Sequence, residues 1–261
     1  MDSIKKFLLV IVISILMLPA RTFSMKKLCK KLIVRSLSIG FRKKKKVLVL
    51  MGPPGSGKTT LSNMLSEEIN WSKFSAGKIC KNLNISESGE LVADEFICLE
   101  LKNWLNENFS SSSGIIIDGF PRTVKQAKSL NSLLGDNLGH SDLKVVSLKY
   151  DPETIIYQTS NRYVCSNKEC SKVYLLTDCS SLVPKKGMIC DRCSSTLVRR
   201  RDDEPEIVEK RLKAYHGYEK KLTSFYKNEH LDFVAFKLDF DDSALSLDEQ
   251  FEKFKELIGI N

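Results

Sequence analysis

The sequence predicts an α/β fold in which helices cover a parallel sheet, and three observations support this. Residues 47–51 read VLVLM, a continuous apolar run that suits a strand buried on both faces, and a glycine-rich loop and a helix pattern follow it. A second apolar run, at 115–117, ends in Asp118. The chain closes with a strand pattern, LDFVAFKLDF, and a helix pattern, SLDEQFEKFKELIGI. Together these elements predict a strand–loop–helix unit built into a larger sheet.

Length and charge limit the classes of protein that the chain can belong to. Its 261 residues, 42% hydrophobic and 28% charged, indicate a globular chain of one large domain or two small ones. The net charge of +9 lies in residues 1–46, which hold 13 of the 41 basic residues and a single acid, Asp2. From Val47 onward, 28 basic residues face 31 acidic ones. The charge therefore gives no argument for nucleic-acid binding, and we expect no nucleic-acid partner.

Residues 1–24 resemble a secretory signal peptide. Two lysines precede the apolar run 7–18, which is well short of the roughly 20 residues of a membrane-spanning helix. Cleavage is expected near Ala20 or Ser24, and a retained anchor or an unrelated buried segment are the alternatives. We expect no stable membrane span in the mature form.

Residues 25–46 resemble a transit peptide, because they are rich in Lys, Arg and Ser and contain no acid. From Ser3 the chain has no acidic residue before Glu67. A signal and a transit peptide in series resemble the two-part leader of proteins sent to a complex plastid, and a mitochondrion is also possible. The alternatives are a secretory lumen, anchoring by an uncleaved leader, and, for Arg42–Lys46, a solvated tail or a nuclear or anionic-lipid patch.

The loop after the first strand fits the phosphate-binding pattern Gly-x4-Gly-Lys-Ser/Thr. Backbone N–H groups can wrap phosphates there, Lys58 can span the terminal phosphates, and the Thr59 hydroxyl can reach Mg²⁺. The helix that follows has one apolar face, formed by Leu61, Met64, Leu65 and Ile69. The predicted nucleotide-binding residues are Gly52, Gly55, Ser56, Gly57, Lys58, Thr59 and Thr60.

The segment GIIIDGFPRT places a second set of polar residues at the end of a buried strand. A carboxylate at the end of such a strand lies beside the phosphate loop, where Asp118 can hold Mg²⁺ directly or through water. Gly119 follows it, and Arg122 places a guanidinium just beyond the strand. Alone the segment could be a turn, but together with the phosphate loop it predicts a nucleotide site.

At this point the chain resembles the adenylate kinase family of nucleoside monophosphate kinases, from about Val47 to the C-terminus. The resemblance implies a P-loop NTPase-type parallel sheet wrapped by helices, with two mobile inserts. An acceptor-binding insert would span 75–98, and a lid at 163–199 would close over the triphosphate donor. The blocks that carry the resemblance are GPPGSGKTT (52–60), LVADE (91–95), DGFPRTVKQA (118–127) and RRRDDEPEIVEKRL (199–212).

The resemblance also implies roles for residues that the motifs match. Arg122 should hold the acceptor phosphate, and the Gln126 amide should read the acceptor base. Because phosphoryl transfer spreads charge over equatorial oxygens, it relies on positioning and positive charge. The residues that should clamp the transferring group are Arg162, Arg200 and Arg211, oriented by Asp202 and Asp203 when the lid closes.

Four cysteines fall inside the expected lid. Four residues separate Cys165 from Cys170 and two separate Cys190 from Cys193, which is close to the spacing of a four-thiolate zinc site. Some lids of the family carry such a structural zinc. Disulfides are the main rival, and Asp178 or Cys179 could replace a ligand. The remaining cysteines are predicted to be plain buried thiols at 80 and 98, and part of the leader at 29.

The acceptor-binding insert departs from the family. The chain reads SAGKICK, with Ala76, Lys78 and Lys81 where the family has threonine, aspartate and arginine, and the insert is shortened by about a dozen residues. Lys81 is still expected to contact nucleotide, but it cannot make a bidentate phosphate contact. Gln158 and Phe240 replace an arginine and a glycine, which leaves the donor base open.

The sequence therefore predicts an enzyme, a monomer, that uses Mg²⁺ with ATP or GTP and phosphorylates a nucleoside monophosphate, with AMP favoured. A P-loop kinase of a different small molecule is the first alternative. The second is a non-catalytic nucleotide-binding module.

Overall fold

The computed structural model describes residues 45–82, 93–138, 142–177, 182–229, 231–238 and 246–260. The predicted signal peptide, and all but the end of the predicted transit peptide, lie outside the described residues. Within them, no helix combines the length and the apolar character needed to cross a membrane.

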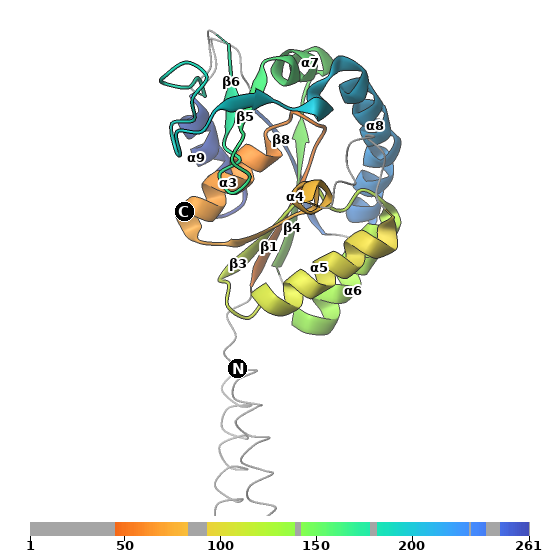
Figure 1. Ribbon diagram of the computed structural model, residues 1–261. Helices are drawn as coiled ribbons and strands as arrows, with labels where there is room; N and C mark the ends of the chain where they lie inside the picture. The colour runs from red at the N-terminus through yellow and green to blue at the C-terminus, as the bar shows by residue number, and fades with distance from the viewer. Residues whose placement is uncertain are drawn as a thin grey trace, which may run out of the picture. The chain divides into compact units, whose positions relative to one another are not determined.

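The α/β prediction is confirmed by a five-stranded sheet in which every neighbouring pair is parallel. The strand order β2-β3-β1-β4-β8 places β1 at the centre (Figure 1). In that register Leu50 lies beside Asp118 on one side and Val146 on the other. The strands are β1 (Lys46–Met51), β2 (Ser72–Ser75), β3 (Gly114–Asp118), β4 (Asp142–Lys149) and β8 (Asp232–Lys237).

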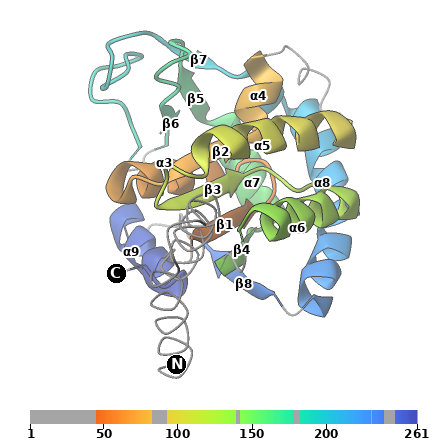
Figure 2. The same cartoon turned by 90° about the horizontal axis from the view of Figure 1, so that it is seen from below.

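Helices cover both faces of the sheet, as Figure 2 shows from below. Alternate residues of each central strand point to opposite faces. Val49 and Ile117 accordingly pack under α5, α6 and α8, whereas Leu50 and Ile116 pack under α3 and α9. The helices are α3 (Lys58–Ile69), α4 (Ala76–Asn82), α5 (Asp94–Asn108), α6 (Val124–Leu138), α7 (Pro152–Ser160), α8 (Pro205–Asn228) and α9 (Leu247–Leu257).

The C-terminal helix α9 begins with a capping box. The Ser246 side chain accepts from the Glu249 N–H, and the Glu249 carboxylate accepts from the Ser246 N–H. Phe251 and Phe254 form its buried face, with Gln250 and Ile258 buried beside them.

A small antiparallel sheet forms the base of the predicted lid. Its order is β6-β5-β7, formed by Val173–Leu175, Arg162–Cys165 and Leu197–Arg199. A short 3₁₀ turn, η2 (Arg201–Asp203), then leads into α8. The lid thus leaves the main domain after α7 and returns to it before α8. Both of its ends lie close to α8, which contacts α7 and η2.

Candidate functional site

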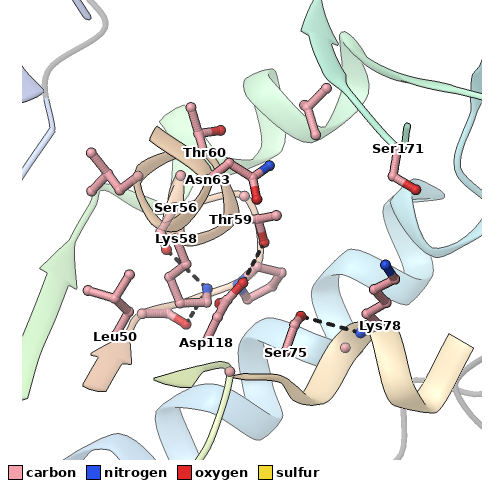
Figure 3. A pocket seen from close by; sticks show the side chains of 18 of the residues that line it. Leu50, Ser56, Lys58, Thr59, Thr60, Asn63, Ser75, Lys78, Asp118 and Ser171 are labelled. Carbon is pink, nitrogen blue, oxygen red and sulfur yellow. Dashed lines mark hydrogen bonds between the residues drawn. The ribbon is translucent and has the colours of Figure 1, made fainter. Parts of the chain in front are cut away.

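The loop between β1 and α3 holds Lys58 over its own backbone. Gly57 takes φ 77°, a left-handed conformation that suits glycine, at the N-cap of α3. The Lys58 ammonium donates to the carbonyls of Gly52 and Pro53, at 2.8 and 2.7 Å, and to the Ser56 hydroxyl at 3.2 Å (Figure 3). These bonds place one positive charge at the mouth of the loop, beside the N-terminus of a helix, where phosphate is stabilised.

Burial lowers the pKa of Lys58 to about 7. The Asp118 carboxylate opposes the shift, while the guanidinium groups of Arg122, Arg211 and Arg162 add to it by repulsion. A bound polyphosphate would restore the charge, because it brings negative oxygens to a desolvated ammonium. The phosphate loop is therefore surrounded by positive charge that an anionic ligand would balance.

Asp118 meets the phosphate loop at the C-terminal edge of the sheet. The Thr59 hydroxyl donates to its carboxylate at 2.9 Å, and the Asp118 residue is 3% exposed. A hydroxyl and a carboxylate in contact supply the hard oxygen ligands that Mg²⁺ takes in nucleotide sites. These two side chains therefore fit the Mg²⁺ that the sequence predicts.

Arg122 is fixed by the turn after β3. Its Nε donates to the Gly119 carbonyl at 3.0 Å, and its backbone N–H donates to the Gln126 amide oxygen at 2.6 Å. The Gln126 amide nitrogen donates to Asp94 at 2.7 Å, and the Thr123 hydroxyl donates to the other oxygen of the same carboxylate at 2.8 Å. Asp94 thereby ties the start of α5 to the turn that orients Arg122.

Three arginines gather where the lid joins the main domain, and two aspartates hold them. Both Arg162 and Arg200 make two-pronged contacts, with Asp203 and Asp202 respectively. Arg211 of α8 donates to the Asp202 carboxylate at 3.0 Å. Burial lowers the pKa of Arg211 to about 10, since the attraction of Asp202 offsets only part of the desolvation. The Arg211 guanidinium thus remains charged at neutral pH.

These elements surround one cavity of about 670 Å³, lined by both the main domain and the lid. A cavity of this size suits a nucleotide-sized ligand. The predicted residues that line it are Gly52, Gly55, Ser56, Gly57, Lys58, Thr59, Thr60, Asp118, Gly119, Arg122, Arg162, Arg200, Asp202 and Arg211.

The other residues singled out from the sequence differ in whether they reach the cavity. Gln126 is 2% exposed and absent from the cavity lining, and both atoms of its amide bond to protein groups. Asp203 is fully buried behind Arg162. Gln158 is buried and touches the cavity. The Lys81 side chain, residues 83–92 of the expected insert and Phe240 lie outside the described residues.

The four lid cysteines come together, as their spacing in the sequence predicts. Their sulfur atoms all lie within 4.8 Å of one another, with Cys165 and Cys193 3.3 Å apart and Cys170 and Cys190 3.7 Å apart. A tetrahedral zinc with bonds of about 2.3 Å separates its sulfurs by about 3.8 Å. All four are free thiols, as are Cys80 and Cys98, so the donor set fits zinc.

Tyr174 supports the cysteine cluster from β6. Its hydroxyl accepts from the Asp191 N–H at 2.7 Å and donates to the Cys190 sulfur at 3.3 Å. Burial would raise the pKa of Cys190, but hydrogen bonds from Tyr174 and from the backbone N–H groups of Arg192 and Cys193 lower it to about 6. This favours the thiolate, the form that binds metal.

Sequence reasoning assigned no role to two residues that now matter. Lys73 lines the cavity from the edge strand β2, and Asp94 orients the Arg122 turn. Asp94 lies in LVADE (91–95), one of the blocks that carry the resemblance, and that membership was the sequence signal that could have pointed to it. Lys73 gave none, because its neighbours come from distant parts of the chain.

Comparison with known proteins agrees with this geometry. A family model described as adenylate kinase matches residues 50–231. An adenylate kinase of Thermosipho africanus is 35% identical over 223 residues, covering 81% of this chain and 98% of the relative. An adenylate kinase of Clostridium tetani is 31% identical over 225 residues, with coverage of 81% and 98%. One of Caldicellulosiruptor saccharolyticus is 34% identical over 200 residues, with coverage of 72% and 90%.

Proposed function

This chain belongs to the adenylate kinase family of nucleoside monophosphate kinases, and from that premise we propose that it transfers the terminal phosphoryl group of ATP to AMP. The observation that carries the proposal is the single cavity in which the phosphate loop, Asp118, Arg122 and the lid arginines meet. GTP is the alternative donor, because Gln158 and Phe240 stand where the family has an arginine and a glycine.

The donor end of the reaction is the phosphate loop. Backbone N–H groups of the loop bind the donor phosphates, and Lys58 leaves its carbonyl partners to hold the terminal phosphoryl oxygens. Thr59 and Asp118 would hold Mg²⁺. When bound with the nucleotide, that ion neutralises phosphate charge.

The acceptor end is organised by Arg122, which binds the acceptor phosphate from its fixed turn. Arg162, Arg200 and Arg211 then surround the group in transfer and stabilise the charge on its equatorial oxygens. No protein nucleophile is needed, because one phosphate attacks the other directly. The bond from the donor's terminal phosphorus to the bridging oxygen breaks as the bond to the acceptor oxygen forms.

The lid excludes water, which would otherwise compete as acceptor. We propose that its cysteine cluster binds a structural Zn²⁺ through Cys165, Cys170, Cys190 and Cys193. Four thiolates leave no open coordination position, so the metal would hold the small lid together without entering the chemistry.

The proposal is tested by a coupled assay of the full chain with MgATP or MgGTP and each nucleoside monophosphate. We expect AMP to be the preferred acceptor. A preference for another monophosphate would correct the acceptor assignment. Absence of turnover with every monophosphate, from a chain that binds ATP, would reject the function and favour a different small-molecule acceptor.

Delivery to an organelle is a separate proposal, supported by the leader sequence alone. Residues 1–46 fused to a fluorescent protein should direct it to a plastid or mitochondrion, and retention in the secretory lumen would contradict this.

A further inference from the structure

Two lysines that line the cavity take no part in the mechanism above. Lys73 comes from β2 and Lys78 from α4, and both line the cavity. Figure 3 shows Lys78 extending from α4 into the pocket. Neither arises from the phosphate-loop motif, and Lys78 stands where the resemblance predicts an aspartate.

Although both lysines line the cavity, no carboxylate in the described part of the chain lies within 4.0 Å of either ammonium. Lys125, Lys149 and Lys255, by contrast, each pair with a glutamate. The Lys73 ammonium donates instead to the neutral amide oxygen of Asn63. The cavity therefore contains positive charge that protein groups in direct contact do not neutralise.

The surroundings of Lys73 make that charge costly. Burial lowers its pKa, the more distant carboxylates of Asp118 and Glu67 oppose the shift, and the charge of Lys78 adds to it. A partly buried cation without an ionic partner is unfavourable unless a ligand supplies the opposite charge. Such an arrangement in a cavity is typical of a binding site.

We propose that Lys73 and Lys78 form an anion subsite that binds the phosphate group of the acceptor. The inference rests on the proposed function and deepens it. Because an ammonium is a point charge without the fixed fork of a guanidinium, this subsite selects for negative charge more than for one phosphate geometry. Lys78 belongs to the expected acceptor-binding insert, and the subsite would compensate for the arginine that Lys81 replaces.

The test uses the full chain with Lys73→Met and Lys78→Met, which remove charge and keep length. Binding of AMP, of adenosine and of a non-hydrolysable MgATP analogue is measured by calorimetry, separately from turnover. A charge-assisted hydrogen bond contributes about 1.5–3 kcal/mol, so each variant should weaken AMP binding by about tenfold or more. Adenosine and the ATP analogue should bind within about twofold of wild type, and Lys78→Arg should bind AMP nearly as wild type does.

Lys102→Met is the matched control, since Lys102 is exposed on α5 and outside the cavity lining. Thermal unfolding of every variant checks that the fold is intact. Unchanged AMP affinity in both lysine variants overturns the inference, as does an equal loss for the ATP analogue.

The proposed function can fail separately from this inference. A wild-type chain that binds AMP through these lysines but does not phosphorylate it would support the subsite and refute the activity. Turnover of AMP with no loss of AMP binding in the variants would support the activity and refute the subsite. A wild-type chain that binds no AMP refutes the inference.

Discussion

Replacing Asp203 with asparagine should destabilise the protein more than a surface change would. Asp203 is fully buried, and its partner Arg162 is 13% exposed at the side chain. The carboxylate accepts from Nε at 2.8 Å and from a second guanidinium nitrogen, while Arg200 lies 4.0 Å away. Asparagine keeps the shape and one acceptor but removes the charge.

The magnitude follows from these contacts. Two charge-assisted hydrogen bonds contribute about 1.5–3 kcal/mol each, and removing one partner of a buried pair costs about 3–5 kcal/mol. Since the amide retains one bond, we expect the free energy of unfolding to fall by about 3 kcal/mol. For a domain of this size, that lowers Tm by about 6–12 °C.

Urea and thermal unfolding of Asp203→Asn measure this loss. The double variant Arg162→Met with Asp203→Asn is the control, because it leaves no buried charge unpaired and should recover most of the stability. It should not recover activity, since Arg162 lines the cavity. A single variant within about 1 kcal/mol of wild type would refute the reasoning that the pair is buried and closed.

Three further predictions concern the sheet, the lid and the phosphate loop. Gly114→Ala should lower the free energy of unfolding in urea by about 2–3 kcal/mol, because the added Cβ would lie 2.2 Å from the Trp71 ring. Gly217→Ala, which has open space around it in α8, should raise that free energy by up to about 1 kcal/mol. Equal effects of the two variants would be inconsistent with this packing. Tyr174→Phe should weaken zinc binding by about 10–100-fold in competition with a chelator, because Cys190 loses its hydrogen bond from the tyrosine hydroxyl. Tyr163→Phe, on the facing strand, is the control and should leave zinc affinity unchanged. Similar zinc affinities of the two variants would argue against the support of Cys190 by Tyr174. Because burial lowers the pKa of Lys58 to about 7 and phosphate raises it again, ATP binding at about pH 8 should take up protons, and at about pH 6 this lysine should contribute little. Calorimetry in buffers of different ionisation enthalpy measures the uptake, and Lys58→Met should abolish it.

The parts of the site that the sequence predicted are local. The phosphate loop, its strand and its helix are contiguous, and a glycine pattern with one lysine defines them. The meeting of Asp118 with Thr59 was also predictable, because parallel strands end at one edge of the sheet. The lid cysteines were predictable as a group from their spacing.

The parts that were missed, or implied only in outline, depend on tertiary packing. The resemblance implied that Asp202 and Asp203 orient the lid arginines, but not which carboxylate pairs with which guanidinium. Pairing of Arg162 with Asp203 and of Arg200 with Asp202 cannot be read from a run of adjacent charges, because it is decided by how η2 turns into α8. Contact of Lys73 with Asn63 joins β2 to α3. The position of Gln126 also depends on α5, whose Asp94 engages the amide that the resemblance assigns to the acceptor base.

The measurement that tests the central claim most directly follows the phosphoryl group itself. The full chain is incubated with AMP and MgATP radiolabelled in the terminal phosphate, beside a Lys58→Met variant. We predict that the label appears in the outer phosphate of ADP formed from AMP, and that the variant loses this transfer. Label released only as inorganic phosphate, or no transfer from a chain that binds both nucleotides, would contradict the assignment.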